Sequence, residues 1–308
     1  MDKIRIAIVG LGKIARDQHL PSIAASGTFE LAAIASPHSS LTGVPCHRSI
    51  EDLLQQERGI DAVALCTTPQ VRYQAARHAL EHGCHVLLEK PPGATLGEVD
   101  ALVDLAERKG VALFASWHSR FAAAVEPARA WLATRKVRSV TLTWKEDVRV
   151  WHPGQGWIWK GGGLGVFDPG INALSILTRI LPRAVILREA ELSIPSNCET
   201  PIAARLQLAD SGDAPIRAEF DFRQTGLQTW DIDVQTDDGS LLLSMGGSAL
   251  QVKGQTVSLA QTAEYPLLYA HFAALVRECR IDVDLAPLQL VADALLCGRH
   301  RPVEAFVE

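Results

Sequence analysis

The chain has 308 residues, 47% of them hydrophobic, which is enough material for two domains with buried cores. Its formal net charge of -5 and its scattered lysines and arginines argue against a nucleic-acid-binding protein, because phosphate binding needs a concentrated basic surface. The most apolar region, residues 174–187, is interrupted by Arg179, Pro182 and Arg183 and is too short to span a membrane.

The N-terminus and the cysteines predict a cytoplasmic protein. MDKIRIAIVG leads directly into a predicted strand, without the apolar segment and cleavage site of a signal peptide. The six cysteines form no C-x-x-C pair, and Cys66 and Cys297 lie in apolar patterns typical of buried thiols. We therefore expect reduced cysteines and no metal site.

A buried strand predicted over residues 4–9 is followed at once by the glycine motif GLGKIA. Gly10 permits a tight turn, Gly12 lets the backbone approach a pyrophosphate, and Ala15 keeps the following helix close to the strand. The motif therefore predicts a dinucleotide site, and a glycine turn without a ligand is the alternative. The residues expected to contact the cofactor here are Gly10, Gly12, Lys13 and Ile14.

Strands and helices then alternate up to about residue 120. Strands are predicted over residues 29–35, 61–66, 85–90 and 111–116, and helices over residues 71–82 and 96–109. Such alternation predicts an α/β fold with a doubly wound parallel sheet, the Rossmann arrangement. We assign it to a domain of residues 1–120.

The segment after the second strand decides which nicotinamide cofactor is preferred. An acidic residue there would hold the ribose hydroxyl of NAD, but the sequence is SPHSS. The hydroxyl of Ser36 and the imidazole of His38 can donate to a 2′-phosphate, so we expect NADP, with NAD tolerated. A solvent-facing loop histidine without a ligand is the alternative for His38.

Two further strand ends carry candidate residues. Thr67, Thr68 and Pro69 follow the third strand and are expected to line the cofactor. Glu89 and Lys90 close the fourth strand, where open α/β sheets place their chemistry. A surface lysine without a function is the alternative. The apolar run before Lys90 and the two prolines after it favour a functional residue.

From about residue 121 the pattern changes to period-two alternation. Apolar and polar residues alternate in residues 140–145, 217–223 and 230–235, with turn signals at residues 211–213 and 237–239. This pattern predicts strands spaced for hairpins in a largely antiparallel, open sheet.

We assign residues 121–308 to this second α/β domain. The polar face of its sheet is expected either to be solvated or to pair with a second copy in a homodimer.

The segment WKEDVRVWHPGQGWIW mixes aromatic rings with charged groups. Trp151 and His152 precede Pro153-Gly154 and are expected on a loop of the substrate pocket, with Glu146 nearby. For Trp144 we prefer a place in the core. The four tryptophans of the segment are Trp144, Trp151, Trp157 and Trp159.

The glycine-rich stretch GGGLGVFDPGINAL brings a carboxylate and an amide together. Asp168 and Asn172 are four residues apart, which places them on one face of a helix. We expect the glycines to let the loop approach the nicotinamide and the substrate. Asp168 followed by Pro169 could also be an ordinary helix N-cap.

GLGKIA, EKPPGATLGE and GGGLGVFDPGINAL together resemble the Gfo/Idh/MocA family of sugar dehydrogenases, over the whole chain and in the right order. The stretches WHSR and VFDPGINALS are similar to those of its aldose 1-dehydrogenases. The resemblance implies a nicotinamide ring held between the two domains. It also implies NAD(P)-dependent oxidation of an aldopyranose, L-arabinose or D-galactose, at C1 to the lactone.

The resemblance places the family's lysine at Lys90 and its aspartate at Asp168. Many members carry a histidine four residues after that aspartate as the general acid/base, but here the residue is Asn172, which cannot transfer protons near neutral pH. The proton therefore falls to Asp168 or to Lys90, and the two assignments stay open. The residues expected to contact the sugar are Lys90, His118, Glu146, Trp151, His152, Asp168 and Asn172.

Three alternatives remain. His118 could be a buried histidine with a structural partner. The chain could act on inositol or on another sugar, or it could be a sensor that binds the dinucleotide and catalyses nothing. The presence of both Lys90 and Asp168 favours an enzyme.

Overall fold

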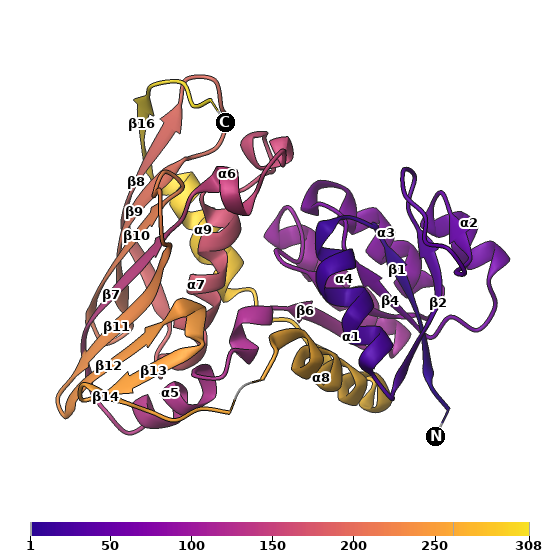
Figure 1. Ribbon diagram of the computed structural model, residues 1–308, viewed down its shortest axis with the longest axis horizontal. Coiled ribbons are helices and arrows are strands. Elements are labelled where there is room, and N and C mark those ends of the chain that lie inside the picture. The colour runs from indigo at the N-terminus through magenta and orange to yellow at the C-terminus, as the bar shows by residue number, and fades with distance from the viewer. Residues whose placement is uncertain (1, 261, 308) are drawn as a thin grey trace. The chain divides into compact units, whose positions relative to one another are not determined.

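The computed structural model describes residues 2–260 and 262–307 and divides into two compact units (Figure 1). The first consists of Met1–His118 and Ala263–Asp284, and the second of Ser119–Thr262 and Leu285–Glu308. Residues 263–284, which we expected in the second domain, therefore belong to the first unit.

The first unit is built on a seven-stranded sheet in which every pairing is parallel, with the order β15-β6-β5-β4-β1-β2-β3. This confirms the Rossmann fold predicted from the alternation. Its strands are β1 (Ile4–Val9), β2 (Phe29–Ala35), β3 (Cys46–His47), β4 (Ala62–Leu65), β5 (His85–Glu89), β6 (Leu113–Ser116) and β15 (Ile281–Asp282).

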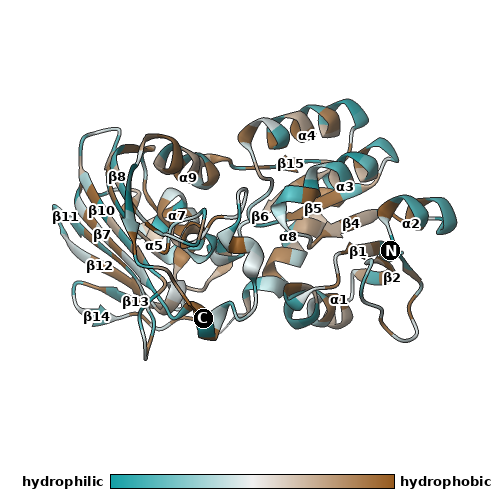
Figure 2. Ribbon diagram, turned by 90° about the horizontal axis from the view of Figure 1, so that it is seen from above, coloured by the Kyte–Doolittle hydropathy of each residue, from teal (hydrophilic) through white to brown (hydrophobic). Residues whose placement is uncertain are grey.

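Helices cover both faces of this sheet, and its strands are correspondingly apolar (Figure 2). On one side lie α2 (Ile50–Gln56), α3 (Pro69–Glu81) and α4 (Leu96–Lys109), whose buried residues share one core with the strands. On the other side lie α1 (Leu20–Ala25) and α8 (Glu264–Glu278).

Aromatic packing explains why residues 263–284 return to the first unit. In α8, the Phe272 ring stacks on Phe29 of β2 and on Phe114 of β6, with centroids 5.9 and 6.2 Å apart. Tyr269 meets Phe29 edge to face at 5.4 Å. β15 then extends the sheet by pairing with β6. Sequence analysis assigned no element to this segment, and the sheet that its helix covers is decided by these tertiary contacts.

The second unit contains a nine-stranded sheet with the order β14-β13-β12-β11-β7-β10-β9-β8-β16. It is largely antiparallel, as expected, but β7 pairs in parallel with β10 and β8 with β16. The strands are β7 (Val137–Lys145), β8 (Val185–Pro195), β9 (Ala203–Asp210), β10 (Pro215–Asp221), β11 (Thr229–Thr236), β12 (Gly239–Ser244), β13 (Ala249–Val252), β14 (Gln255–Thr256) and β16 (Arg299–Val303).

One face of this sheet is covered and the other is open within the described residues (Figure 1). α5 (Val125–Leu132), α7 (Phe167–Ile180) and α9 (Ala286–Cys297) lie on the covered face. α7 approaches the sheet closely because Gly170 has no side chain. A Cβ there would lie 2.7 Å from the ring of Phe220.

No helix in the described part of the chain is long and apolar enough to cross a membrane.

Candidate functional site

The turn after β1 has the geometry that a dinucleotide requires. Gly10 has φ +91°, and a Cβ there would lie 2.9 Å from the backbone nitrogen of Thr67, so a side chain is excluded. A Cβ on Gly12 would meet nothing within 4 Å, which leaves open space for a ligand beside that backbone. Ala15 is completely buried. These residues fit a cofactor pyrophosphate.

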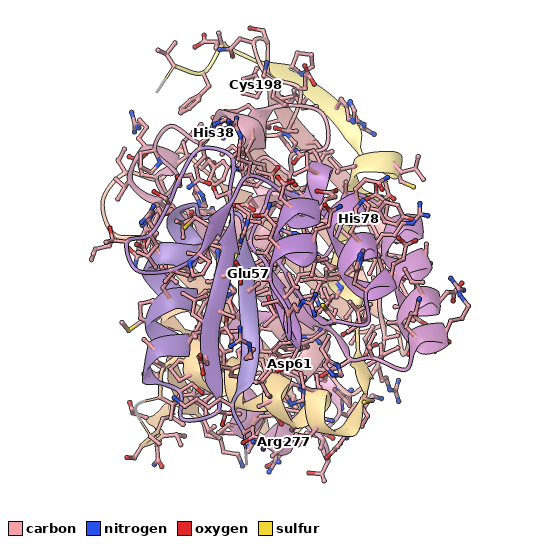
Figure 3. All side chains as sticks on the ribbon, turned by 90° about the vertical axis from the view of Figure 1, so that its right-hand side faces the viewer. His38, Glu57, Asp61, His78, Cys198 and Arg277 are labelled. Carbon is pink, nitrogen blue, oxygen red and sulfur yellow. The ribbon has the colours of Figure 1, made fainter. Side chains whose placement is uncertain are left out.

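A cation that sequence analysis missed lies beside the segment after β2. Arg16, in the π-helical turn Ala15–His19, directs Nη2 toward the carbonyl of Ser40 at 3.5 Å. In Figure 3, His38 lies at the opposite end of the strands from Asp61, on the side where β2 ends. A basic residue in the first turn after the glycine motif was the available sequence signal for Arg16.

The end of β4 lies next to the turn after β1. Thr67 carries a buried hydroxyl that has no hydrogen-bond partner among the described residues. Thr68 and Pro69 begin α3, and no side-chain hydrogen bond caps that helix. An unpaired buried hydroxyl suits a polar ligand.

Glu89 is buried, with both carboxylate oxygens occupied inside the first unit. Oε1 lies 3.0 Å from His19 Nε2 and accepts from the Tyr265 hydroxyl at 2.8 Å, while Oε2 accepts the Lys90 N–H at 2.8 Å. The predicted contact between Glu89 and the cofactor would therefore have to come from its backbone. Lys90 itself is partly buried.

His118 also has a partner within the first unit. Its Nδ1 lies 2.5 Å from Glu264 Oε2, and its ring stacks on Tyr265 with centroids 5.4 Å apart. His118 thus has the structural partner that we considered as an alternative, although its ring is only partly buried. A contact between His118 and a sugar stays a prediction.

A cluster of three ionisable side chains occupies the second unit. His152 Nε2 lies 3.0 Å from Glu146 Oε1, and His152 Nδ1 lies 3.6 Å from Asp168 Oδ2. The other Glu146 oxygen accepts from the indole nitrogen of Trp230 at 2.8 Å. Glu146 and Asp168 are 2% and 4% exposed, so two carboxylates flank one imidazole with little water.

Three local structures deliver this cluster. Glu146 follows β7, and its N–H donates to the carbonyl of Asp221. His152 ends the short helix α6 (Val148–Trp151), which is capped by the Asp147 carboxylate. Asp168 lies inside the first turn of α7, whose N-cap is Val166, so Asp168 is not the N-cap that we considered. Its side chain lies beside His152.

The glycine loop packs closely on its own chain. A Cβ on Gly163 would lie 2.4 Å from the carbonyl oxygen of Trp157. Gly165 has φ +53°, and a Cβ there would lie 2.3 Å from the carbonyl oxygen of Pro201. These two glycines let the loop pack on its neighbours before α7 begins. The expected reason, approach to nicotinamide and sugar, is not needed to explain them.

Stacked indoles border the ionisable cluster. Trp230 stacks on the buried Trp144 with centroids 5.6 Å apart, which supports the core role preferred for Trp144. The Trp151 ring packs on the other indole, Trp230, at 4.8 Å and is 42% exposed. An exposed ring beside buried polar groups is a surface on which a pyranose can stack. Trp230 was not predicted, since its strand pattern indicated only a core residue.

Asn172 lies one turn after Asp168 on α7 and is partly buried. The structure records no hydrogen bond of its side-chain amide within the described residues, while its carbonyl accepts from Ser175. The amide is thus free to bind a ligand. In the described part of the chain, no three His, Cys, Asp or Glu side chains are arranged to hold a metal ion.

Comparisons with known proteins identify the family of the chain. Residues 4–116 match the GFO_IDH_MocA model, described as an oxidoreductase family with an NAD-binding Rossmann fold. The chain is 44% identical over its full 308 residues to a galactose 1-dehydrogenase from Pseudomonas fluorescens, and the match covers 100% of both proteins.

Solved structures give the same result. The D-galactose-1-dehydrogenase from Rhizobium etli superposes with a TM-score of 0.95 at 54% identity, covering 100% of this chain and 99% of that one. A 3-ketoreductase from Actinomadura kijaniata, solved in complex with NADP, has a TM-score of 0.85 at 16% identity, covering 98% and 100%, and shares the fold.

Proposed function

The chain belongs to the Gfo/Idh/MocA family of oxidoreductases, and from that membership we propose that it oxidises D-galactose and L-arabinose at C1. The observation that carries the substrate class is full-length identity of 44% and 54% to two galactose 1-dehydrogenases. The Glu146–His152–Asp168 cluster beside an exposed indole supports it, since it offers charged acceptors to sugar hydroxyls and a ring to the sugar face.

The reaction removes a proton from O1 and a hydride from C1, which converts the pyranose to the lactone. The nicotinamide cofactor, when bound, accepts the hydride. The chain must take the proton and hold O1. Asp168 is our candidate base, and Asn172 one turn later would donate to O1 or to the neighbouring hydroxyl. Lys90 remains the competing base.

His152 offers a path for that proton. Its Nδ1 faces the Asp168 carboxylate, and its Nε2 faces Glu146. A proton collected by Asp168 can therefore pass to the imidazole, and Glu146 holds the ring in place. This arrangement supplies an imidazole from a different loop, where many family members have one at the position of Asn172.

We propose NADP as the preferred cofactor. The turn after β2 carries Ser36 and His38 and no acidic residue, and Arg16 adds a guanidinium beside Ser40. A 2′-phosphate would gain a charge-assisted partner there. The amide groups after Gly10 and Gly12 would hold the pyrophosphate.

The open face of the nine-stranded sheet supports a homodimer. Ion pairs line it, among them Lys145–Glu219 at 2.7 Å and Arg205–Glu191 at 3.7 Å. A two-fold axis could pair this mixed-charge face with itself. The predicted cytoplasmic location stays a prediction.

The test is an assay of purified protein with a panel of aldoses and inositol, each with NADP and with NAD. D-Galactose and L-arabinose share their C2 to C4 stereochemistry, so both should react. Asp168→Asn should abolish turnover while NADP still binds by fluorescence titration. A variant that kept most of its turnover would exclude Asp168 as the base, and a panel without turnover would overturn the proposed function.

A further inference from the structure

We propose that Glu89 is a positioning residue, which fixes the backbone of Lys90 through a buried hydrogen-bond frame supplied by His19 and Tyr265. This role rests on the proposed function, because the position of Lys90 matters only if the Lys90 amine takes part in the reaction. It differs from the direct cofactor contact predicted for Glu89.

The first step is the hydrogen bond between Glu89 and the residue that follows it in the sequence. Glu89 is the last residue of β5, and its Oε2 accepts the N–H of the very next residue, Lys90, at 2.8 Å. The carboxylate is 3% exposed, so this bond has little competition from water. The plane of the Lys90 peptide is thus tied to an interior group.

The second step is the set of groups that hold the carboxylate still. Oε1 accepts a hydrogen bond from the Tyr265 hydroxyl at 2.8 Å and lies 3.0 Å from His19 Nε2. On its far side, His19 Nδ1 lies 2.7 Å from the hydroxyl of Tyr269. The carboxylate of Glu89 is therefore held through both oxygens and cannot rotate without losing several buried hydrogen bonds.

The third step concerns the backbone carbonyl oxygens on either side of Lys90. The guanidinium of Arg72, 2% exposed, donates to the carbonyl oxygens of Glu89, Pro91 and Thr67. Arg72, a side chain from α3, thus fixes the Glu89–Lys90 peptide and the Pro91–Pro92 peptide, one before Lys90 and one shortly after it.

The fourth step is the origin of the partners. His19 comes from the π-helical turn after the glycine motif, and Tyr265 and Tyr269 come from α8, in the segment that returns to this unit. A π-helical turn is rare and found often at functional sites, and here it brings His19 to Glu89. Three segments distant in sequence therefore meet at the residue before Lys90.

The charges are consistent with this frame. Burial alone would raise the pKa of Glu89, but His19, His118 and Tyr265 outweigh it and lower that pKa to about 2. For His19, burial alone would lower the pKa, but Cys66, Tyr269 and Glu89 outweigh burial and raise the pKa. A buried ion pair is seldom kept for stability alone, and fixing the geometry of an adjacent reactive group is a reason to keep it.

The test is a double-mutant cycle between Glu89 and Lys90. Glu89→Gln should lower kcat for galactose by about 10- to 100-fold and leave the KM for NADP within about 2-fold. Tyr265→Phe, which keeps His19 as a partner, should lose less in the same direction. In a Lys90→Ala background, Glu89→Gln should cause no further loss. Glu98→Gln, an acid to amide change on α4, is the matched control.

The backbone amide signal of Lys90 in 15N–1H NMR gives a readout that does not depend on activity. It should shift and exchange faster with solvent in Glu89→Gln, but not in Glu98→Gln. Full additivity with Lys90→Ala, or an unchanged Lys90 amide signal, would overturn the positioning role. If the unmutated protein oxidises no aldose, the proposed function fails, and the amide signal alone decides whether the frame holds Lys90.

Discussion

His152 Nδ1 lies 3.6 Å from Oδ2 of Asp168, and Glu146 holds the opposite edge of the same imidazole at 3.0 Å. A carboxylate, an imidazole and a second carboxylate thus lie in a row within the second unit. Asn172 cannot carry a proton, but the His152 imidazole beside Asp168 can.

We expect His152→Asn to lower kcat for galactose by roughly 10- to 100-fold, because the amide keeps a polar contact but cannot accept the proton. The acidic limb of the pH–rate profile should change together with kcat. His78→Asn is the matched control, since His78 also pairs with a carboxylate, Glu51, at 3.1 Å. Equal rates for both variants would exclude a role for His152 in proton transfer.

Replacing Trp151 with Ala should raise the KM for sugars about 5- to 20-fold with a smaller change in kcat. The partly exposed indole packs on Trp230 at 4.8 Å and offers the ring on which we expect the pyranose to rest. Trp151→Phe should recover most of the affinity. Steady-state kinetics with galactose and arabinose provide the measurement, and unaltered KM values in the Ala variant would place the sugar elsewhere.

Arg16→Ala should raise the KM for NADP by about tenfold and leave the KM for NAD nearly unchanged, because only NADP carries the phosphate that a guanidinium would bind. Arg77→Ala, another exposed arginine that pairs with Glu81 on α3, is the control. A parallel loss for both cofactors would mean that Arg16 acts on the fold and not on the 2′-phosphate.

Gly165→Ala should destabilise the second unit by about 3 kcal/mol or more, because φ is +53° and the new methyl group would overlap the Pro201 carbonyl oxygen. Gly161→Ala should cost far less, since its nearest atom is the flexible end of Glu199 at 3.1 Å. Urea unfolding of both variants compares the two sites. Similar losses would show that the loop does not need its observed path.

The His19–Glu89 pair predicts a pH dependence of stability. The pKa of Glu89 falls from 4.5 to about 2 on folding, so its contribution is complete above pH 4.5 and is lost as the pH drops toward 2. The pKa of His19 is raised, so its contribution is complete below 6.5 and is lost as the pH rises through the folded value. The pair therefore stabilises most between about pH 4.5 and 6.5.

Urea unfolding between pH 3 and pH 6 measures the acidic side of this dependence. Loss of the Glu89 contribution amounts to about 3 kcal/mol at most. Glu89→Gln should flatten the dependence, whereas Glu278→Gln, a surface acid paired with Arg280, should not. An unmutated protein whose stability does not change in this range would contradict the ion pair.

Local sequence patterns were sufficient to predict the Rossmann sheet. The buried strand before Gly10, the helix 96–109 and the placement of Lys90 at a strand end all follow from period and turn chemistry, which depend on neighbours in the chain. No element was assigned to residues 264–278, and the docking of the helix found there on β2 and β6 is a tertiary preference of aromatic rings.

The candidate site was predictable as a set of residue types but not as a set of contacts. Glu146 and His152 were chosen from one tryptophan-rich segment and Asp168 from the glycine-rich stretch. Nothing in their spacing indicates that one imidazole lies between the two acids. The parallel pairing of β7 with β10 was missed for the same reason, because alternation gives the face of a strand but not its neighbour. The backbone contacts of Gly163 and Gly165 were not predicted either, because they are made with other segments of the chain.

The return of α8 and β15 to the first unit limits how this protein can be divided experimentally. The chain passes from one unit to the other after residues 118, 262 and 284, so the nucleotide-binding module has no single cut point. A fragment that ends at His118 would leave Phe29 and Phe114 without their cover and the Glu89 carboxylate without Tyr265. Such a fragment should aggregate, whereas a fusion that joins residues 1–118 to residues 263–284 through a short linker preserves the complete module.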